Sequence, residues 1–310
     1  MPHFLEMTTG SRSCKRHPHD TFVQTLIYTF LVWNRYGTTT MTVRTDPVPQ
    51  NEPTPGIEAV EAFWNARPCN IRHSPKPVGS REYFDEVEQR KHFVEPHIPE
   101  FAQFDHWAGK RVLEVGCGIG TAAVNFARCG ANYTGVELSQ ASLDLTRKRF
   151  DVYGLKGRFI FCNAERLSQH VERNHYDLVY SFGVIHHSPN QRAIVEEIRK
   201  VVRDDGEFRC MLYAKNSWKD IMIEAGLDQP EAQRGCPIAT SYTIEMVHDL
   251  YKGLFDVVSA TQTHIFPYVI EKYVNYEYEL QPWFKAMRRE MFAALERRLG
   301  WHMLIVGRPV

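Results

Sequence analysis

The feature that most constrains the fold is a short segment in which an apolar run gives way to glycines at alternate positions. Residues 112–121 read VLEVGCGIGT, with Gly116, Gly118 and Gly120 in the loop. A ligand can approach glycine main chain within van der Waals distance because glycine carries no side chain. A strand followed by such a loop and a helix presents backbone N–H groups and a helix N-terminus at the strand's carboxyl end. The segment therefore predicts an α/β fold with a ligand-binding site at this edge of the sheet.

From residue 106 onward, short apolar segments alternate with amphipathic ones. Strands are expected at residues 111–115, 132–138, 158–162, 177–182 and 208–214. Helices are expected between them, at residues 122–129, 139–153 and 191–202. Ser139 and Gly154 are suitable caps for the second of these helices. Strands separated by helices form right-handed βαβ units, so the pattern predicts a doubly wound, mostly parallel sheet covered on both faces.

The spacing of the glycines argues against a dinucleotide ligand. A dinucleotide-binding loop has the pattern GxGxxG, whereas this chain has GxGxG and carries Thr121 where the last glycine would lie. Glu114 lies two residues before the first glycine. A carboxylate there would repel a pyrophosphate and attract a cationic ligand. Glu114 and the loop residue Cys117 are therefore candidate ligand-binding residues, and a nicotinamide-dependent oxidoreductase is the less favoured alternative.

Polar residues also stand at the ends of the second and third predicted strands. Glu137, followed by Leu138, lies 21 residues after Gly116, and a carboxylate there can accept hydrogen bonds from ribose hydroxyls. Asn163 and Ala164 follow the third strand, where a short polar side chain could bond an adenine amino group. Each residue alone is compatible with an ordinary turn or a solvated acid. Their order at successive strand ends favours a nucleoside-binding site.

Taken together, these segments resemble the motifs of class I S-adenosylmethionine-dependent methyltransferases of the small-molecule, ubiquinone-methylase-like type. The matching segments are residues 112–120, 135–139, 163–167, 176–190 and 203–208. The resemblance implies a Rossmann-like sheet of seven strands with the last one antiparallel, and S-adenosyl-L-methionine as the cofactor. It also implies that the carboxyl end of the fourth strand, at Ser181, lies beside the cofactor. The chain departs from the family at Asn163, where the family usually carries aspartate.

Two adjacent histidines follow the fourth strand. Methyl transfer from a sulfonium needs alignment and exclusion of water, and it needs a base only if the acceptor must lose a proton. His186 and His187 are the best-placed candidates for that base, acting on a phenol, a carboxylic acid or an amine. Either histidine could instead only shape the loop before Pro189. Neighbouring side chains diverge, so the pair is not a metal signature and no metal ligands are expected.

Composition and one missing motif bear on the acceptor. Lys+Arg and Asp+Glu each total 37, so the formal net charge is zero, which does not favour extended contact with nucleic-acid phosphates. The Asn/Asp-Pro-Pro-aromatic stretch of enzymes that methylate exocyclic base nitrogens is absent. A small organic acceptor is therefore expected, through oxygen, nitrogen or carbon and possibly in secondary metabolism. The alternatives are a non-catalytic, cofactor-binding subunit of a complex and, less favoured, an RNA methyltransferase.

Three regions are expected along the chain. Residues 1–56 predict a disordered leader and a proline-rich linker, and residues 57–105 predict an N-terminal helical cap. Residues 106–310 form the expected methyltransferase domain, with an aromatic, largely helical insert at about 267–299 before a last strand at 302–307. Tyr83 and Arg90 in the helical cap and Tyr268 in the insert are candidate substrate contacts. Alternatively, the aromatic face of the helical cap packs onto the sheet.

Cysteine usage and the N-terminus suggest where the protein works. The seven cysteines include no CxxC pair, which indicates reduced thiols and a cytoplasmic protein. The mainly apolar residues 21–34 are too short to cross a bilayer, which takes roughly 20 apolar residues. They could be part of a dispensable leader, a targeting segment or an ordered part of the fold. No stable membrane insertion is expected, and a homodimer is a possible assembly.

Overall fold

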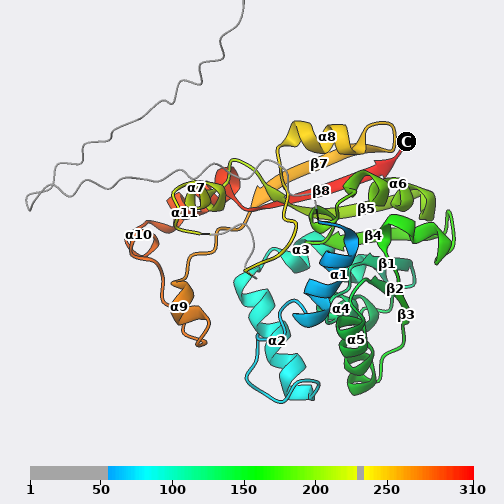
Figure 1. Cartoon of the computed structure of the whole chain (residues 1–310), viewed down its shortest axis with the longest axis horizontal. Helices are drawn as coiled ribbons and strands as arrows, with labels where there is room; N and C mark the ends of the chain where they lie inside the picture. The colour runs from blue at the N-terminus through cyan, green and yellow to red at the C-terminus, as the bar shows by residue number, and fades with distance from the viewer. Residues whose placement is uncertain (1–54, 229–233) are drawn as a thin grey trace, which may run out of the picture. The chain divides into compact units, whose positions relative to one another are not determined.

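The computed structural model describes residues 55–228 and 234–310, so the predictions for residues 1–54 lie outside the described residues. In this part of the chain an eight-stranded sheet has the order β3-β2-β1-β4-β5-β8-β7, with β6 paired to β5 (Figure 1). The strands are β1 Arg111–Val115, β2 Asn132–Glu137, β3 Arg158–Phe161, β4 Tyr176–Phe182, β5 Val202–Ala214, β6 Ser241–Tyr242, β7 Phe255–Thr263 and β8 His302–Pro309. Only β8 runs antiparallel to its neighbours, β5 and β7. The predicted mostly parallel sheet with an antiparallel last strand is confirmed, and the short β6 adds an eighth strand.

Helices cover both faces of the sheet, as the doubly wound pattern predicts (Figure 1). They include α4 Thr121–Arg128, α5 Gln140–Tyr153, α6 Gln191–Val201 and α8 Ile244–Tyr251. Successive residues of a strand face opposite sides. Leu113 of β1 accordingly packs into the core formed with α6 and α8. Its neighbour Val112 packs into the core formed with α4 and α5.

Local signals set the boundaries of the helices beside the glycine loop. Helix α4 begins directly after Gly120, whose φ of 79° suits glycine. Helix α5 begins after Ser139, whose hydroxyl accepts a hydrogen bond from the Ser142 N–H at 3.1 Å. It ends at Gly154, which adopts the left-handed conformation with φ of 66°. Both predicted caps of α5 are therefore confirmed.

The N-terminal part of the described chain is helical and packs beside the glycine loop. It contains α1 Ile57–Ala66, α2 Arg81–Val94, α3 Ile98–Ala102 and the short 3-10 helix η1 Phe104–Trp107. Tyr83, Phe84 and Val87 on α2 are fully buried and form a cluster with Ile119 of the loop. The apolar face of α2 therefore supports the loop from outside the sheet.

The predicted helical insert is more broken than its sequence suggests. Residues 269–299 form three separate helices, α9 Ile270–Tyr273, α10 Pro282–Lys285 and α11 Arg289–Leu299, and α7 Trp218–Glu224 precedes them. Tyr276 adopts a left-handed conformation with φ of 65°, which a continuous helix cannot accommodate. Tyr268 pairs with Leu280 in an isolated β-bridge that folds the segment back on itself. The expected helical insert thus consists of three helices separated by short loops.

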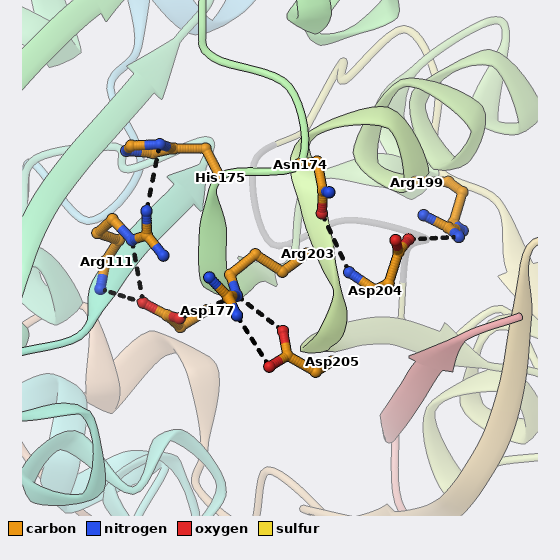
Figure 2. A network of polar contacts seen from close by, with 8 residues as sticks. All are labelled: Arg111, Asn174, His175, Asp177, Arg199, Arg203, Asp204 and Asp205. Atoms are coloured by element: carbon orange, nitrogen blue, oxygen red, sulfur yellow. Dashed lines mark hydrogen bonds and ion pairs between the residues drawn. The ribbon is translucent and has the colours of Figure 1, made fainter.

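An ion-pair network joins the amino ends of the central strands, away from the glycine loop (Figure 2). Asp177 at the start of β4 accepts a hydrogen bond from the Arg111 N–H of β1 at 2.8 Å. The Arg203 guanidinium of β5 lies 3.4 Å from the same carboxylate and bonds Asp205 at 2.7 Å. The network fixes one edge of the sheet and leaves the opposite edge, where the strands end, to form the site.

Candidate active site

A cavity of about 200 Å³ lies at the carboxyl ends of β1, β2, β3 and β4. Most of the predicted cofactor-binding residues line it. They are Glu114, Gly116, Cys117, Gly118, Glu137, Leu138, Asn163 and Ala164. The structure thus brings residues from three successive strand ends to one cavity, as the sequence analysis expected of a nucleoside site.

Two glycines of the loop are needed for different reasons. Gly116 has φ of +78°, and a Cβ placed on it would lie 2.3 Å from Cγ2 of Val184. Gly118 has φ of +54°, and a Cβ there would meet no atom within 4 Å. Because Gly118 also lines the cavity, the space a side chain would fill is open to a ligand. Packing therefore requires glycine at 116, whereas access to the main chain accounts for glycine at 118.

Glu137 ends β2 with its carboxylate turned toward the glycine loop. Its Oε2 accepts a hydrogen bond from the Gly118 N–H at 2.8 Å. Its Oε1 accepts from the N–H groups of Leu138 and Ser139, both at 2.9 Å. Burial raises the pKa of Glu137 above its ordinary value, although these three N–H donors act in the opposite direction. A carboxylate has about four acceptor sites, so capacity remains for a ligand hydroxyl.

Glu114 is an acid held largely out of water. It is 4% exposed and accepts a hydrogen bond from the Tyr133 hydroxyl at 2.6 Å. Burial raises the pKa of Glu114 to about 8, with a further contribution from the charge of Glu137, while the bond from Tyr133 opposes the rise. A group that titrates near neutrality in this wall would become ionised beside a bound cation.

Asn163 uses its side chain to cap the short 3-10 helix η2 Ala164–Gln169. Its Oδ1 accepts a hydrogen bond from the Glu165 N–H at 2.9 Å. Because a backbone N–H requires an acceptor, the oxygen is the capping atom and the amide nitrogen is the remaining polar atom. Asn163 therefore offers the cavity a hydrogen-bond donor. The sequence analysis expected an acceptor for an adenine amino group at this position.

The adjacent histidines, on η3 Ile185–His187, have different surroundings. His187 lines the cavity, and its Nδ1 lies 2.6 Å from the carbonyl oxygen of Ile238. A carbonyl only accepts, so Nδ1 carries the ring proton and Nε2 carries the lone pair.

His186 is fully buried and is not part of the cavity wall. Neither ring nitrogen has a hydrogen-bond partner among the described residues. Its ring lies against Tyr213 with centroids 3.9 Å apart. Burial, followed by the influence of His187, lowers the pKa of His186 well below its ordinary value. Only His187 of the predicted pair reaches the cavity.

Two other predicted residues are buried behind the cavity wall. Ser181 is fully buried, and its hydroxyl donates to the carbonyl oxygen of Val115 at 3.2 Å. The Tyr83 hydroxyl donates to the carbonyl oxygen of Ile71 at 2.9 Å. Neither residue lines the cavity, and both hydroxyls are engaged with main chain.

The remaining two predicted substrate residues, Arg90 and Tyr268, contact aromatic side chains outside the cavity. The Arg90 guanidinium lies over the ring of Tyr273 at 4.0 Å and over that of Tyr276 at 4.4 Å. Tyr268 stacks on Phe93 with centroids 6.1 Å apart. These contacts join α2 to the insert, and neither residue lines the cavity.

The structure adds cavity residues that the sequence analysis did not select. Those with aromatic or cationic side chains include Trp64, Lys91, Phe182 and Tyr213. Phe182 and Tyr213 lie at or next to the carboxyl ends of β4 and β5, so the strand-end rule applied to Glu137 could have found them. Trp64 and Lys91 lie on α1 and α2, where nothing local in the sequence points toward the cavity.

The wall chemistry fits a cationic nucleoside. Gly118 leaves open main chain, and Glu137 supplies an inward-facing carboxylate beside it. Glu114 provides an acid that a positive charge would ionise. The aromatic rings of Phe182 and Tyr213 line the same cavity and can attract a cation through their faces.

Sequence comparisons assign a domain to this part of the chain. Residues 112–206 match the family model of a methyltransferase domain. The ubiquinone biosynthesis O-methyltransferase of Erwinia tasmaniensis is 30% identical over 122 residues, covering 39% of this chain and 49% of the relative. Methyltransferase GfsG of Streptomyces halstedii is 26% identical over 160 residues, covering 50% of this chain and 54% of the relative. The chain thus spans about half the length of these curated relatives.

Solved structures share the fold. The magnesium protoporphyrin IX methyltransferase of Synechocystis PCC 6803 with bound SAH has a TM-score of 0.53 at 14% identity, covering 81% of this chain and 98% of that one. The geranyl diphosphate C-methyltransferase of Streptomyces coelicolor has a TM-score of 0.52 at 15% identity, covering 82% and 97%. At such identities the likeness shows the fold, which agrees with the observed sheet.

Proposed function

Because residues 112–206 form a class I S-adenosylmethionine-dependent methyltransferase domain, we propose that this chain transfers a methyl group from S-adenosylmethionine to a small organic acceptor. One observation carries the proposal. Gly118 leaves open space at the cavity wall, and the carboxylate of Glu137 faces the same loop. The methyltransferases among the sequence relatives support the reaction class. The zero net charge of the chain supports a small acceptor over a nucleic acid.

In this reaction the chain's own residues would exclude water, position the acceptor and, where needed, take a proton from it. The cofactor would supply a methyl group bound to a positively charged sulfur. After the transfer that sulfur would be part of a neutral thioether. Trp64, Phe182 and Tyr213 form an aromatic wall that can exclude water and position a flat or apolar acceptor. His187 keeps its lone pair on Nε2 because Nδ1 is held at the Ile238 carbonyl. Where the acceptor must lose a proton, His187 is the group proposed to take it.

Methyl transfer by the purified chain tests the proposal. S-adenosylhomocysteine should raise the melting temperature of the protein. Incubation with a methyl-labelled cofactor and a fractionated cell extract should then yield a labelled small molecule in the mass spectrum, which identifies the accepting atom. Transfer by the chain alone excludes a cofactor-binding subunit without activity. Absence of both the thermal shift and the labelled product would refute the proposed function.

Glu114 predicts a pH dependence of cofactor binding. Its pKa of about 8 means that the carboxyl group is largely protonated at neutral pH. A bound cation favours the carboxylate, so binding expels a proton and affinity rises as the pH approaches about 8. Replacing Glu114 by glutamine should weaken binding and flatten this dependence. Calorimetry in two buffers of different ionisation enthalpy measures the protons released, and an equal release by Glu114→Gln would contradict the assignment.

The same substitution has an opposite effect on stability. The pKa of Glu114 is higher in the folded chain than its ordinary value of 4.5, so the folded state loses stability as the pH rises from there to about 8. Glutamine has no charged form to desolvate and can still accept from Tyr133. Glu114→Gln should therefore raise the melting temperature at pH values above neutrality, while the two proteins become more alike in mild acid.

Replacing Asn163 by aspartate should raise the affinity for the cofactor. Asn163 uses one of the two lone pairs of its only side-chain oxygen on the cap of η2, so its amide nitrogen, which is a donor, is the polar atom left without a role in the cap. Aspartate keeps the cap and adds a second oxygen as acceptor. Asn163→Asp should strengthen binding of S-adenosylhomocysteine by about 0.5–1.5 kcal/mol, the net value of one hydrogen bond.

A matched control exists at the start of α6. Asn190 also caps a helix through Oδ1, accepting from the Ala193 N–H at 3.2 Å, and does not line the cavity. Asn190→Asp makes the same chemical change and should leave affinity unaltered in calorimetric titration. Unchanged or weaker binding by Asn163→Asp would mean that Asn163 does not face the base.

Location and assembly follow as further parts of the proposal. No helix in residues 55–228 or 234–310 is long and apolar enough to cross a membrane. Cys117, Cys129, Cys162 and Cys210 form no disulfide, which supports a reducing compartment such as the cytoplasm. A homodimer stays a prediction, which light scattering of the purified chain would test.

A further inference from the structure

Three histidines and a glutamate meet behind the cavity, at a place that methyl transfer does not use. Glu95 is the C-cap of α2, and His97 lies two residues further on. His302 is the first residue of β8. His97 Nε2 lies 3.0 Å from His302 Nδ1, and Oε2 of Glu95 lies 3.9 Å from that same nitrogen. Potential ligand atoms of Glu95, His97 and His302 all lie within 4.8 Å of one another.

We propose that Glu95, His97 and His302 bind a divalent transition-metal ion of the zinc type. Zinc takes imidazole nitrogens and carboxylate oxygens at about 2.0–2.2 Å in tetrahedral sites, which places neighbouring ligand atoms roughly 3.3 Å apart. The two nitrogen and oxygen separations at His302 Nδ1, 3.0 and 3.9 Å, bracket that value. Two imidazoles and one carboxylate form a ligand set that suits zinc, cobalt or nickel better than calcium or magnesium.

The glutamate supplies independent support for a ligand. Its Oε2 is buried without a hydrogen-bond partner among the described residues. Its Oε1 accepts from the Lys91 ammonium at 2.6 Å, which orients the carboxylate as an outer partner does in metal sites. The Oε2 atom lies 3.9 Å from His302 Nδ1, so a polar atom without a hydrogen bond faces the imidazole pair.

The two histidines face each other through ring nitrogens. His97 Nε2 and His302 Nδ1 lie 3.0 Å apart. A ring nitrogen that carries no proton has a lone pair for an ion. Without an ion, the two facing nitrogens can share only one proton.

A third imidazole, that of His264, stands beside the set. Its ring centroid lies 4.6 Å from that of His302 and 5.4 Å from that of His97. His264 holds a φ of +72°, a left-handed conformation that costs a residue with a Cβ about 1 kcal/mol or more. The Trp301 N–H bonds its carbonyl oxygen at 2.8 Å and helps to hold this conformation. His264 is not among the residues whose ligand atoms lie within 4.8 Å of one another, so it borders the three ligands and the fourth position is left to a water molecule.

The ion would have a structural rather than a catalytic part. Glu95, His97 and His302 do not line the cavity. Phe182 contacts both the histidines and the cavity. Its ring centroid lies 6.1 Å from that of His97 and 5.6 Å from that of His302, and its side chain lines the cavity. The ion would join the segment after α2 to the first residue of β8. It would thereby fix the wall that Lys91 and Phe182 present to the acceptor.

Metal content of the untagged chain tests the site without reference to activity. After dialysis against a chelator, the protein should take up one equivalent of Zn²⁺ in calorimetric titration. Co²⁺ should give the intense visible absorption of a tetrahedral site. Bound Zn²⁺ should raise the melting temperature. Failure to retain a stoichiometric ion, or a Co²⁺ spectrum like that of the aqueous ion, would overturn the proposal.

Two variants and a control locate the ion. Glu95→Gln keeps the side-chain volume, and His97→Ala removes one imidazole from a loop. Each should lower Zn²⁺ affinity by about tenfold or more. His248→Ala removes an exposed histidine of α8 and should have no effect. Circular dichroism confirms that each variant is folded. Equal Zn²⁺ affinity in folded Glu95→Gln and the unaltered chain would refute the assignment, since the carboxylate is one of the three ligands.

Discussion

Replacing Gly118 by alanine should lower the affinity for S-adenosylhomocysteine by about tenfold or more, because an extra methyl group in a filled site costs about 1–3 kcal/mol and each 1.4 kcal/mol is tenfold in affinity. A Cβ on Gly118 meets no protein atom within 4 Å, so the methyl group would enter the space beside the cavity. The ligand, not the protein, would have to move. Isothermal titration calorimetry measures the loss.

Gly130 provides the matched control for backbone strain. Its φ is +88°, and a Cβ there would also meet no atom within 4 Å, but it does not line the cavity. Alanine at either position pays about 1–2 kcal/mol for the left-handed conformation. Both variants should therefore lose similar thermal stability, and only Gly118→Ala should lose affinity. Equal affinities in the two variants would show that no ligand approaches the glycine loop at Gly118.

The parts of the fold that sequence predicts are those set by local chemistry. The strand before Gly116, the caps Ser139 and Gly154, and the placement of Glu137 all depend on residues within a few positions of one another. The parallel part of the sheet follows from the alternation of strands and helices along the chain, whereas the antiparallel last strand was implied by the family resemblance. Eight of the nine cofactor-binding residues that were predicted from glycine spacing and from polar residues at strand ends therefore line one cavity. Ser181 was the exception, because alternation along β4 turns its side chain into the core.

The substrate side could not be predicted because it depends on which way helices face. Arg90 and Lys91 are neighbours on α2, but successive residues of a helix are rotated by about 100°. Arg90 therefore lies under the rings of Tyr273 and Tyr276, while Lys91 lines the cavity. Nothing in the sequence fixes that rotation.

The cluster of Glu95, His97 and His302 could not be predicted from the sequence for a related reason. Glu95 and His97 are separated from His302 by more than two hundred positions, so no ligand spacing reveals them. Their approach follows from the antiparallel insertion of β8 between β5 and β7, which brings the first residue of β8 to the edge near α2. Only the assembled sheet shows the cluster.

Glu137→Gln should weaken S-adenosylhomocysteine binding by about 1–3 kcal/mol, the range for hydrogen bonds to a charged group. Glutamine can keep its oxygen at the Leu138 and Ser139 N–H groups. Its amide NH₂ would then face the Gly118 N–H, where the carboxylate now accepts at 2.8 Å. A donor would meet a donor, so the variant loses both the tie to the glycine loop and an acceptor for a ribose hydroxyl.

Glu172→Gln is the control for this last change, because Glu172 is solvent-exposed and pairs with Arg158 at 2.7 Å away from the cavity. Neutralising it removes one negative charge but touches no wall residue, so affinity should stay constant. Glu137 differs in that its charge is held against main chain of the loop itself. Binding constants that agree between the Glu137→Gln and Glu172→Gln proteins would show that the carboxylate at the end of β2 orders the loop without holding the cofactor.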